Sequence, residues 1–466
     1  MRKRSILACL LLTAFTAVTR TAAAQQATPP NIVFILADDL GWGELGCYGN
    51  TFNETPFLDS LASQGLRFTE AYAAAPVCSP TRASILTGEY PARVGITDFL
   101  APKSKEYLNP DSVKTLNELL SAGGYHTGII GKWHLDTHFR DEKGSPAGFH
   151  FDEVIASETK YIADGDYFFP YDKIATLQKG TPGEYLTDRQ SAEAVDYIRR
   201  NSARPFFLYL SYYAVHTRLD APDSVVQRFS EKFDRKYGAG QAARYFSGKR
   251  HQSPHLDNPW LAAMLSRIDA GVGAVMRVLD SAGIARNTIV VFFSDNGGAH
   301  GVANNGGLRA GKSWLYEGGI REPLVIRWPG RVRPGTVTDV PVSSVDFLPT
   351  LLHVAGLPPS PQPADGVDLT RLLEKGRAPR PRALYWYYPS VTAGWKNRMA
   401  AAVRMGDLKL IHFFTDGRDE LYNLRTDPAE KVNLVAEKPR TVRDLTRRLT
   451  AWETSVDAHR NDPPAQ

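Results

Sequence analysis

Four runs of consecutive apolar residues constrain the fold of this chain more than any other feature. They cover residues 31–36, 127–130, 206–210 and 288–293. A run without polar alternation is typical of a strand that is buried on both faces of a parallel sheet. Segments with apolar residues at helical spacing stand between the runs, at 113–122, 185–200 and 261–282. The order strand, helix, strand predicts an α/β fold with a mostly parallel, doubly wound sheet flanked by helices.

The sequence changes character after a Pro-rich stretch at residues 358–363. The segments that follow predict short antiparallel strands at 383–388, 399–403, 408–414 and 420–424, and then a helix over 441–454. We therefore predict three parts: a signal peptide at 1–24, a large domain at 25–369, and a smaller C-terminal α+β domain at 370–466 that contains an antiparallel sheet.

The first residues predict export of the protein. A basic start is followed by an apolar run over residues 6–18 and by small residues up to Ala24, which is the pattern of a cleaved signal peptide. The run is shorter than the roughly 20 residues that span a bilayer, and no comparable run recurs, so we expect no transmembrane segment. The expected location is periplasmic or secreted.

Charge and cysteine content exclude several classes of protein. The chain has 55 Lys and Arg against 50 Asp and Glu, and four of the basic residues fall in the predicted signal peptide. A nearly neutral chain without a basic cluster gives no argument for binding nucleic acid or anionic membranes. Only Cys47 and Cys78 lie outside the signal peptide, which fits neither a disulfide framework nor a Cys-rich zinc site.

Polar residues follow each apolar run at the point where the predicted strand ends. They are Asp38 and Asp39 after the first run, Lys132 and His134 after the second, His216 after the third, and Asp295 and Asn296 after the fourth. In open α/β sheets, functional groups gather at the carboxyl ends of the strands. The sequence therefore predicts one site that is assembled from four strand ends.

The acidic residues of this set predict a cation site. Adjacent carboxylates at Asp38 and Asp39 repel one another unless hydrogen bonds or a cation neutralise them, and Asp295 and Asn296 supply two more oxygen ligands. Three carboxylates and an amide favour Ca²⁺ or Mg²⁺ over zinc.

The pentapeptide Cys78-Ser79-Pro80-Thr81-Arg82 predicts the start of a short helix. Ser79 suits the N-cap and Pro80 suits the first helical position, which places Cys78 just before the helix. Free N–H groups and the helix dipole at this position favour an anion, and we expect them to lower the pKa of the Cys78 thiol.

The remaining candidates are basic residues that fall after apolar strands or in Gly-rich turns. Hydrolysis of a sulfate or phosphate ester needs cations that hold a tetrahedral anion and groups that transfer protons. The residues that supply these groups are Arg82, Lys132, His134, His216 and Lys312.

Together these segments resemble the type I sulfatases, the formylglycine-dependent, arylsulfatase-like family of the alkaline phosphatase superfamily. The matching segments are residues 30–41, 78–88, 131–135, 294–298 and 311–321, and the resemblance spans nearly all of the chain beyond the signal peptide.

The resemblance implies that Cys78 is oxidised to Cα-formylglycine (3-oxoalanine), whose hydrated aldehyde is the nucleophile. It implies a formylglycine-generating or sulfatase-maturating enzyme as a partner. It also implies one Ca²⁺ ion, held by Asp38, Asp39, Asp295, Asn296 and the modified Cys78.

The same resemblance implies roles for the basic residues. Arg82 would hold the diol, and Lys132 and Lys312 would bind sulfate oxygens. His134 would be the base that breaks the intermediate, and His216 together with Lys312 would protonate the leaving oxygen.

Two departures from the family pattern point to substrate preference. Asp136 stands where the family often has Gly, and His216-Thr217-Arg218 stands where the family has His-x-Pro. We therefore expect Asp136, His138 and Arg218 to be candidates for substrate specificity. Both departures leave the candidate catalytic residues themselves unchanged.

The expected function is hydrolysis of sulfuric esters, with a sulfated carbohydrate or a related alkyl or aryl sulfate as substrate. Aromatic residues at 161–171 could stack on sugar rings, or could merely pack the domain surface. Two alternatives stay open: a phosphoester or phosphonate hydrolase of the same superfamily, and a non-catalytic Ca²⁺-dependent glycan-binding protein. Asn296 follows Asp295 where two-metal phosphatases of the superfamily typically have His, which favours the one-metal sulfatase.

Overall fold

The computed structural model of the protein describes residues 29–101, 106–136, 143–158, 167–172, 174–246, 252, 254–390 and 392–458. The predicted signal peptide and His138 lie outside these ranges. No helix within them has the length and apolar character needed to cross a membrane.

The apolar runs form neighbouring strands of one nine-stranded sheet, whose order is β4-β3-β5-β1-β6-β7-β2-β8, with β9 paired to β2. Strands β3, β5, β1 and β6 are parallel, and Ile32 of β1 stands between Phe207 and Ile289 of its two neighbours. Strand β7 runs antiparallel to both β6 and β2. The mostly parallel sheet is therefore confirmed. The strand bounds are β1 Asn31–Ala37, β2 Leu66–Tyr72, β3 His126–Gly131, β4 Glu153–Ile155, β5 Phe206–Ser211, β6 Thr288–Ser294, β7 Arg321–Arg327, β8 Thr336–Thr338 and β9 Val342–Ser343.

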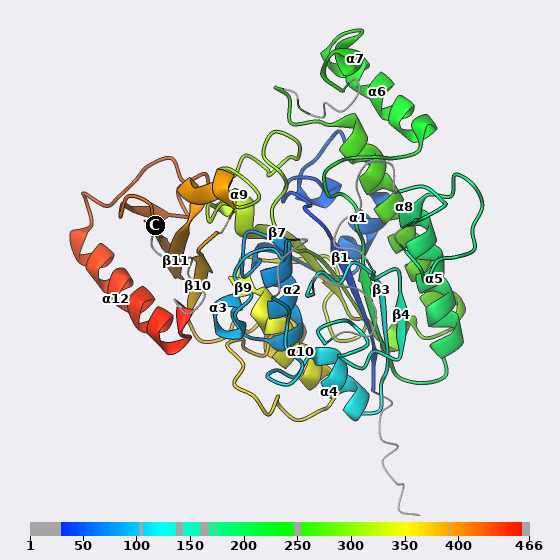
Figure 1. The fold of residues 1–466 in the computed structure, drawn as a ribbon, viewed down its shortest axis with the longest axis horizontal. Coiled ribbons are helices and arrows are strands. Elements are labelled where there is room, and N and C mark those ends of the chain that lie inside the picture. The colour runs from blue at the N-terminus through cyan, green and yellow to red at the C-terminus, as the bar shows by residue number, and fades with distance from the viewer. Residues whose placement is uncertain are drawn as a thin grey trace, which may run out of the picture.

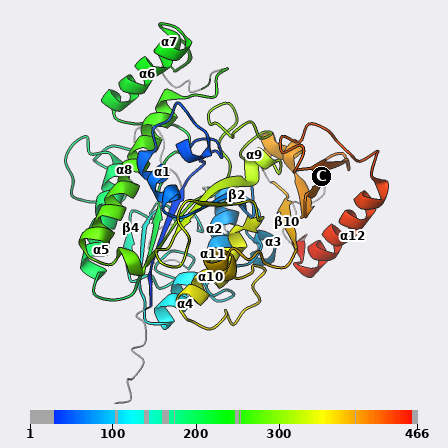
Figure 2. The same cartoon turned by 180° about the vertical axis from the view of Figure 1, so that it is seen from behind.

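Helices cover both faces of this sheet, as Figures 1 and 2 show from opposite sides. Val33 and Ile35 of β1 face a core formed with α1, α5, α6 and α8, whereas Ile32 and Phe34 face a second core formed with α2, α4, α10 and α11. The continuous apolar run of β1 is thus explained by burial on both sides. The helix bounds are α1 Pro56–Ser63, α2 Cys78–Thr87, α3 Pro91–Val94, α4 Leu116–Ala122, α5 Leu186–Asn201, α6 Asp223–Tyr237, α7 Gln241–Phe246, α8 Pro259–Ser281, α9 Glu317–Ile320, α10 Phe347–Val354 and α11 Thr370–Lys375, with 3₁₀ turns η1 Gly46–Tyr48, η2 Ala285–Asn287 and η3 Ser344–Asp346.

A separate four-stranded antiparallel sheet follows, formed by β10 (Ala383–Tyr388), β11 (Ala400–Met405), β12 (Leu408–Phe413) and β13 (Asp419–Asn423). The 3₁₀ turn η4 (Ala393–Arg398) joins β10 to β11, and α12 (Pro439–Ser455) follows β13. The predicted antiparallel sheet and final helix are therefore both present.

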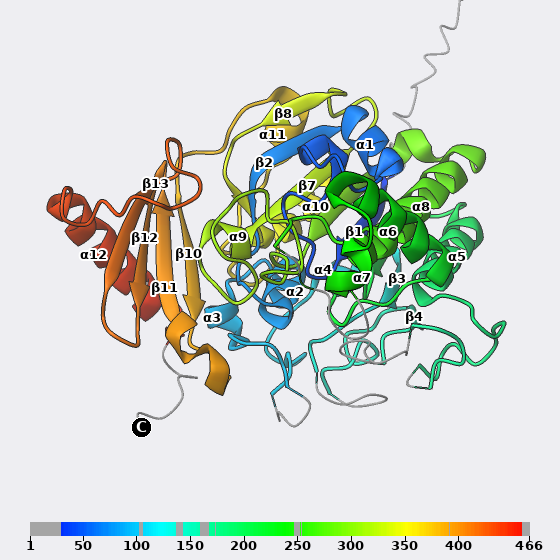
Figure 3. The same ribbon diagram turned by 90° about the horizontal axis from the view of Figure 1, so that it is seen from above.

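The small sheet packs on both of its faces. Trp386 and Ile411 face the large domain, where they meet Tyr72, whereas Val403 faces Trp452 of α12. Figures 1 and 3 accordingly show α12, in red, on the side of the small sheet that is remote from the large domain. Helix α11 packs in the core of the large domain, so the connection between the two sheets runs through residues 376–382. The domain boundary at residue 370 stays a prediction.

One local prediction is wrong. Helix α2 begins at Cys78 and not after it, with Val77 in extended conformation as its N-cap. Ser79 does not cap the helix, because its hydroxyl accepts the N–H of Leu100 at 3.1 Å. Cys78 is therefore the first residue of the helix and is held by the helix backbone.

Candidate active site

The predicted site residues converge at the carboxyl ends of four adjacent strands. Asp38 follows β1, Lys132 follows β3, His216 lies beyond β5, and Asp295 follows β6. The sheet order β3-β5-β1-β6 makes these strand ends neighbours. The prediction of a site built from four strand ends matches this geometry.

Arg82 of α2 ties the strand ends together and is completely buried. Its Nε and Nη2 donate to Oδ2 of Asp295 at 2.9 and 2.7 Å, and its Nη1 donates to the carbonyl of Lys132 at 2.8 Å and to Oγ of Ser211 at 2.6 Å. Its Nη2 also lies 3.6 Å from Oδ1 of Asp38. A planar guanidinium supplies this fork of donors, whereas an ammonium does not. The single side chain of Arg82 therefore contacts all four strand ends.

The backbone of the site adopts conformations that are rare for residues with a side chain. Asp39, His134 and Ser313 have φ of 58, 56 and 70°. Such left-handed conformations persist where the surrounding structure imposes them, and they cluster at functional sites. Gly297 shows how tightly the loops meet, since a Cβ at this position would lie 1.9 Å from the carbonyl oxygen of Gly318. Glycine at this position therefore allows the loop of Asn296 to pack against the loop after Lys312.

The carboxylates and the amide of the site fit an oxygen-liganded cation. Ligand atoms of Asp38, Cys78 and Asp295 all lie within 4.8 Å of one another. Nδ2 of Asn296 donates to Oδ1 of Asp39 at 2.8 Å. Among the described residues, no hydrogen-bond donor reaches Oδ1 of Asp38 or Oδ1 of Asn296, although both atoms are buried. Buried acceptors without a donor are costly unless a cation lies beside them. This donor set suits Ca²⁺ or Mg²⁺.

Two lysines flank the acidic cluster. Nζ of Lys132 lies 2.6 Å from Oδ2 of Asp38, and Nζ of Lys312 lies 2.7 Å from both carboxylate oxygens of Asp39. Burial raises the pKa of Asp38 to about 7 against the attraction of Lys132. Burial acts in the same direction on Asp39, but Lys312 and His216 outweigh it and hold its pKa below the usual range. The site thus holds opposite charges at close range in a dry environment.

His134 faces Cys78 with one defined ring nitrogen. Its Nδ1 lies 3.2 Å from Sγ of Cys78, and its Nε2 lies 3.1 Å from the carbonyl oxygen of Leu100. Because a carbonyl oxygen only accepts, Nε2 carries the hydrogen and Nδ1 is the acceptor that faces position 78. The expected lowering of the thiol pKa is wrong, since Cys78 is only 2% exposed and burial raises its pKa.

His216 and Lys312 lie in direct contact with each other. Nδ1 of His216 donates to the carbonyl oxygen of Thr217, and its Nε2 lies 3.0 Å from Nζ of Lys312. Burial, together with the charge of Lys312, lowers the pKa of His216 to about 3. Burial also opposes the charge of Lys312, but Asp39 outweighs it and raises the pKa of Lys312. The proton of this pair therefore resides on Lys312, and the imidazole accepts a hydrogen bond from it.

The structure describes two of the three candidates for substrate specificity, and these two differ in burial. Asp136 is buried, Arg218 is exposed two residues beyond His216, and His138 lies outside the described residues. Of the aromatic residues expected to stack on sugars or to pack, Tyr167 and Tyr171 are buried in the main core, so packing explains these two.

Sequence reasoning missed two contributors to the site. Ser211 comes directly after the third apolar run, at the end of β5, so the same strand-end argument would have found it. The carbonyl oxygen of Leu100 orients His134 through the backbone, and a backbone contact leaves no signal in the residue type.

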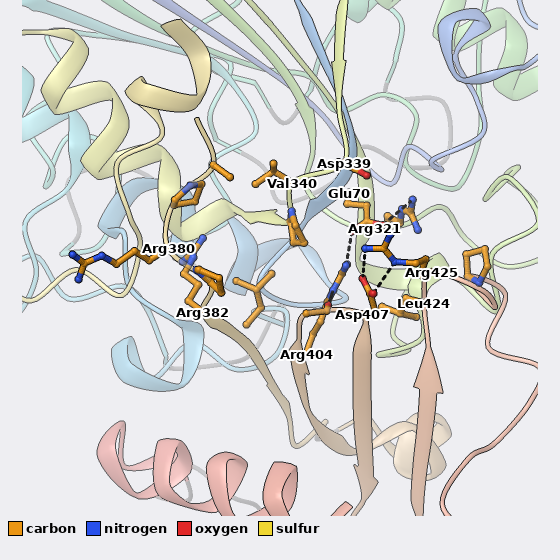
Figure 4. Close-up of a pocket in the computed structure, with 17 residues that line it drawn as sticks. Glu70, Arg321, Asp339, Val340, Arg380, Arg382, Arg404, Asp407, Leu424 and Arg425 are labelled. Atoms are coloured by element: carbon orange, nitrogen blue, oxygen red, sulfur yellow. Dashed lines mark hydrogen bonds and ion pairs between the residues drawn. The ribbon is translucent and has the colours of Figure 1, made fainter. Parts of the chain in front are cut away.

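A second hollow lies at the junction of the two sheets and is separate from this site (Figure 4). It is a cavity of about 540 Å³ rich in arginine, and none of the predicted catalytic residues lines it. Arg404 pairs with Glu70, and Nε of Arg425 lies 2.7 Å from Oδ2 of Asp407. These carboxylates neutralise two of the arginines that line the hollow, and the pair of Arg404 with Glu70 joins the small sheet to the large one.

Comparisons with known proteins agree with this geometry. Residues 30–357 match the family model described as Sulfatase, and residues 309–455 match the model described as N-sulphoglucosamine sulphohydrolase, C-terminal. The chain is 35% identical to arylsulfatase A of Homo sapiens over 94% of this chain and 90% of that protein. It is 35% identical to N-acetylgalactosamine-6-sulfatase of Rattus norvegicus over 76% and 67%. The crystal structure of Ps i-CgsB in complex with k-i-k-neocarrahexaose superposes with a TM-score of 0.78 and 29% identity over 93% of this chain and 94% of that one.

Proposed function

The chain belongs to the sulfatase family and is a sulfatase, and from this premise we propose that it removes sulfate from a sulfated saccharide, with a formylglycine made from Cys78 as nucleophile. One observation carries the proposal. Position 78 stands within ligand distance of Asp38 and Asp295 and 3.2 Å from Nδ1 of His134, at the buried start of α2. The residues proposed as nucleophile, cation ligands and base thus lie close together, which supports the proposal.

We propose Asp38, Asp39, Asp295, Asn296 and the modified residue 78 as the ligands of one Ca²⁺ ion. The orphaned oxygens of Asp38 and Asn296 support this assignment. When bound, the ion supplies Lewis-acid polarisation of the sulfate group. Arg82 fixes the carboxylates of Asp38 and Asp295 in position, since its hydrogen bonds run to the strand ends. We therefore propose that Arg82 holds the diol indirectly, through the arrangement of these ligands.

Sγ of Cys78 stands where an oxygen of the modified residue would lie. A hydrated formylglycine supplies two hydroxyls on one carbon, one to attack sulfur and one whose deprotonation reforms the aldehyde and releases sulfate. His134 accepts that second proton at Nδ1, because its Nε2 is committed to Leu100. Lys312 holds the proton destined for the leaving oxygen at Nζ, and His216 orients this ammonium. Lys132 and Lys312 bind the sulfate oxygens.

The saccharide part of the proposal is supported by relatives whose names include N-acetylgalactosamine-6-sulfatase and by the similar structure that is bound to an oligosaccharide. The chain is proposed to act after export to the periplasm or beyond the cell, and after an oxidising maturation enzyme has converted Cys78. The phosphoester or phosphonate alternative uses the same cations and is separated by substrate choice.

Two measurements test the proposal. Conversion of Cys78 to formylglycine lowers the mass of the peptide that contains it by about 18 Da, since SH and H are replaced by carbonyl oxygen. An active preparation in which this peptide keeps the mass of unmodified cysteine would sink the mechanism. Hydrolysis of sulfated saccharides is then compared with hydrolysis of the corresponding phosphate esters and of a simple aryl sulfate. Turnover of aryl sulfate alone would overturn the saccharide assignment.

A further inference from the structure

Turn η4 of the small sheet reaches two loops of the large domain, one that contacts His134 through its backbone and one that carries Lys312. In Figure 3 this orange segment projects beyond the ends of β10 and β11. The ring of Trp395 lies 5.6 Å from the ring of Phe99. Phe99 precedes Leu100, whose backbone contacts both His134 and Ser79. One end of η4 therefore lies against the loop that orients the proposed base.

The other end of η4 contacts the loop of Lys312. Arg398 donates from Nη1 to Oγ of Ser313, the residue that follows Lys312. Its guanidinium carbon lies 5.2 Å from the ring centroids of both Trp314 and Trp395. Two indoles and a hydroxyl thus fix the direction of this guanidinium, which is a favourable arrangement for a cation on aromatic faces.

The charge of Arg398 has no counter-ion in the described part of the chain. No carboxylate there lies within ion-pair distance of its guanidinium, whereas Arg82, Arg404 and Arg425 all have such partners. Arg398, Phe99, Trp314 and Trp395 are all half-buried, so each is partly exposed to solvent. A fixed guanidinium with partly exposed aromatic neighbours is suited to bind a second anion beside a sugar ring.

We propose that Phe99, Trp314, Trp395 and Arg398, here called the η4 wall, recognise a second acidic group on the saccharide, next to the sulfated position. The group is an oxyanion that a guanidinium can bind in bidentate fashion, either the carboxylate of a uronic acid or a second sulfate. This inference rests on the proposed saccharide sulfatase activity and adds that the preferred substrate is polyanionic. Arg398 is then a specificity-determining residue.

The test uses the full-length enzyme with converted Cys78 and the variant Arg398→Gln. The probes are a monosulfated N-acetylhexosamine, the same residue linked to a uronic acid, the same residue with a second sulfate, and a simple aryl sulfate. We expect KM for one or both doubly anionic probes to rise at least about tenfold, as expected for loss of a charge-assisted hydrogen bond, with kcat little changed. Activity on the neutral-flanked saccharide and the aryl sulfate should stay within about twofold of the wild type.

Arg425→Gln is the matched control, because Arg425 is in the same domain but pairs with Asp407 at the remote hollow. We expect Arg425→Gln to leave KM and kcat unchanged for all four probes. The probe that loses affinity in Arg398→Gln identifies the acidic group as carboxylate or sulfate. Arg398→Lys should fall between wild type and Arg398→Gln, because it keeps the charge but loses the planar fork.

Three results would overturn the inference or its premise, and they are distinguishable. An equal loss on all four probes would mean that Arg398 supports Ser313 and Lys312 and recognises no second anion. If Arg398→Gln leaves KM unchanged for both doubly anionic probes, the η4 wall does not recognise a second acidic group. A wild-type enzyme that hydrolyses the aryl sulfate and none of the saccharides would instead refute the proposed function.

Discussion

Lys409 of β12 is a buried cation that joins the small sheet to the large domain, and its replacement by methionine gives a sharp stability prediction. Its Nζ lies 2.9 Å from Oε1 of Glu317 and 3.0 Å from Oε1 of Glu430, and all three side chains are completely buried. Burial opposes ionisation of Glu317, but Lys409 and nearby arginines outweigh it and lower its pKa, whereas burial raises the pKa of Glu430 to about 7. Glu317 is therefore the principal counter-ion.

The expected magnitude follows from what remains after Lys409→Met. Removing one partner of a buried ion pair costs about 3–5 kcal/mol, because the other charge stays buried. In this variant, Oε2 of Glu317 still accepts a hydrogen bond from the hydroxyl of Tyr72 at 2.7 Å. It also still lies 3.5 Å from Nη1 of Arg321. These contacts place the cost near the lower limit, about 3 kcal/mol. In Glu430→Gln, Lys409 keeps Glu317, and the new amide oxygen can accept the N–H of Glu317, so we expect a cost below about 1 kcal/mol.

Urea unfolding monitored by tryptophan fluorescence measures both effects. Lys409 lies 6.0 Å from the ring of Trp386, so this probe reports on the affected sheet. The free-energy change is obtained from the shift in midpoint multiplied by the slope m, provided that m is the same in both proteins. The reasoning is refuted if Lys409→Met costs less than about 1 kcal/mol, or if Glu430→Gln costs as much as Lys409→Met.

Three further predictions concern the site and its surroundings. Removal of divalent ions with a chelator should abolish activity and lower the unfolding temperature, and added Ca²⁺ should restore both; Asn296→Ala should need more Ca²⁺ for the same recovery, whereas equal recovery would exclude Asn296 as a ligand. His134→Gln should lower kcat by about 10²–10⁴-fold at unchanged fold, as expected for loss of a general base, and a loss below tenfold would remove His134 from proton transfer. Burial raises the pKa of Asp269 to about 6, so the folded chain keeps a proton that the unfolded chain releases above about pH 3.9. The contribution of Asp269 to stability should therefore fall as pH rises from 4 to 7, and the stability of Asp269→Asn relative to the wild type should rise by at most about 3 kcal/mol over that range; a pH-independent difference in chemical unfolding would contradict this.

The sequence predicted the strands whose side chains are apolar on both faces, and it failed where buried strands carry charges. Residues 31–36 have no charge, so their pattern indicates a buried strand at once. Strand β7 begins with Arg321 and Glu322, and both residues are buried next to other charged groups. Such polarity resembles an exposed segment in the sequence. Only the fold shows that Arg321 pairs with Glu317 and that burial beside Asp295 and Asp39 raises the pKa of Glu322.

The site was predictable to the extent that its members follow strands. Asp38, Lys132 and Asp295 were found because each comes directly after an apolar run. Arg398 carries no such signal, because it lies in a short turn between two strands of the other domain. Its place beside Lys312 depends on how the two sheets pack, which is a long-range property that no local pattern encodes.

The burial of Cys78 also bears on when this residue can be modified, relative to folding. Its side chain is 2% exposed at the start of α2, and the groups that enclose it come from positions as distant as Asp295. Under the proposed conversion of Cys78, a modifying enzyme would need residues 78–82 as an extended peptide, before the later strands have joined the sheet. Conversion would then compete with folding, and slower folding should raise the fraction of converted molecules.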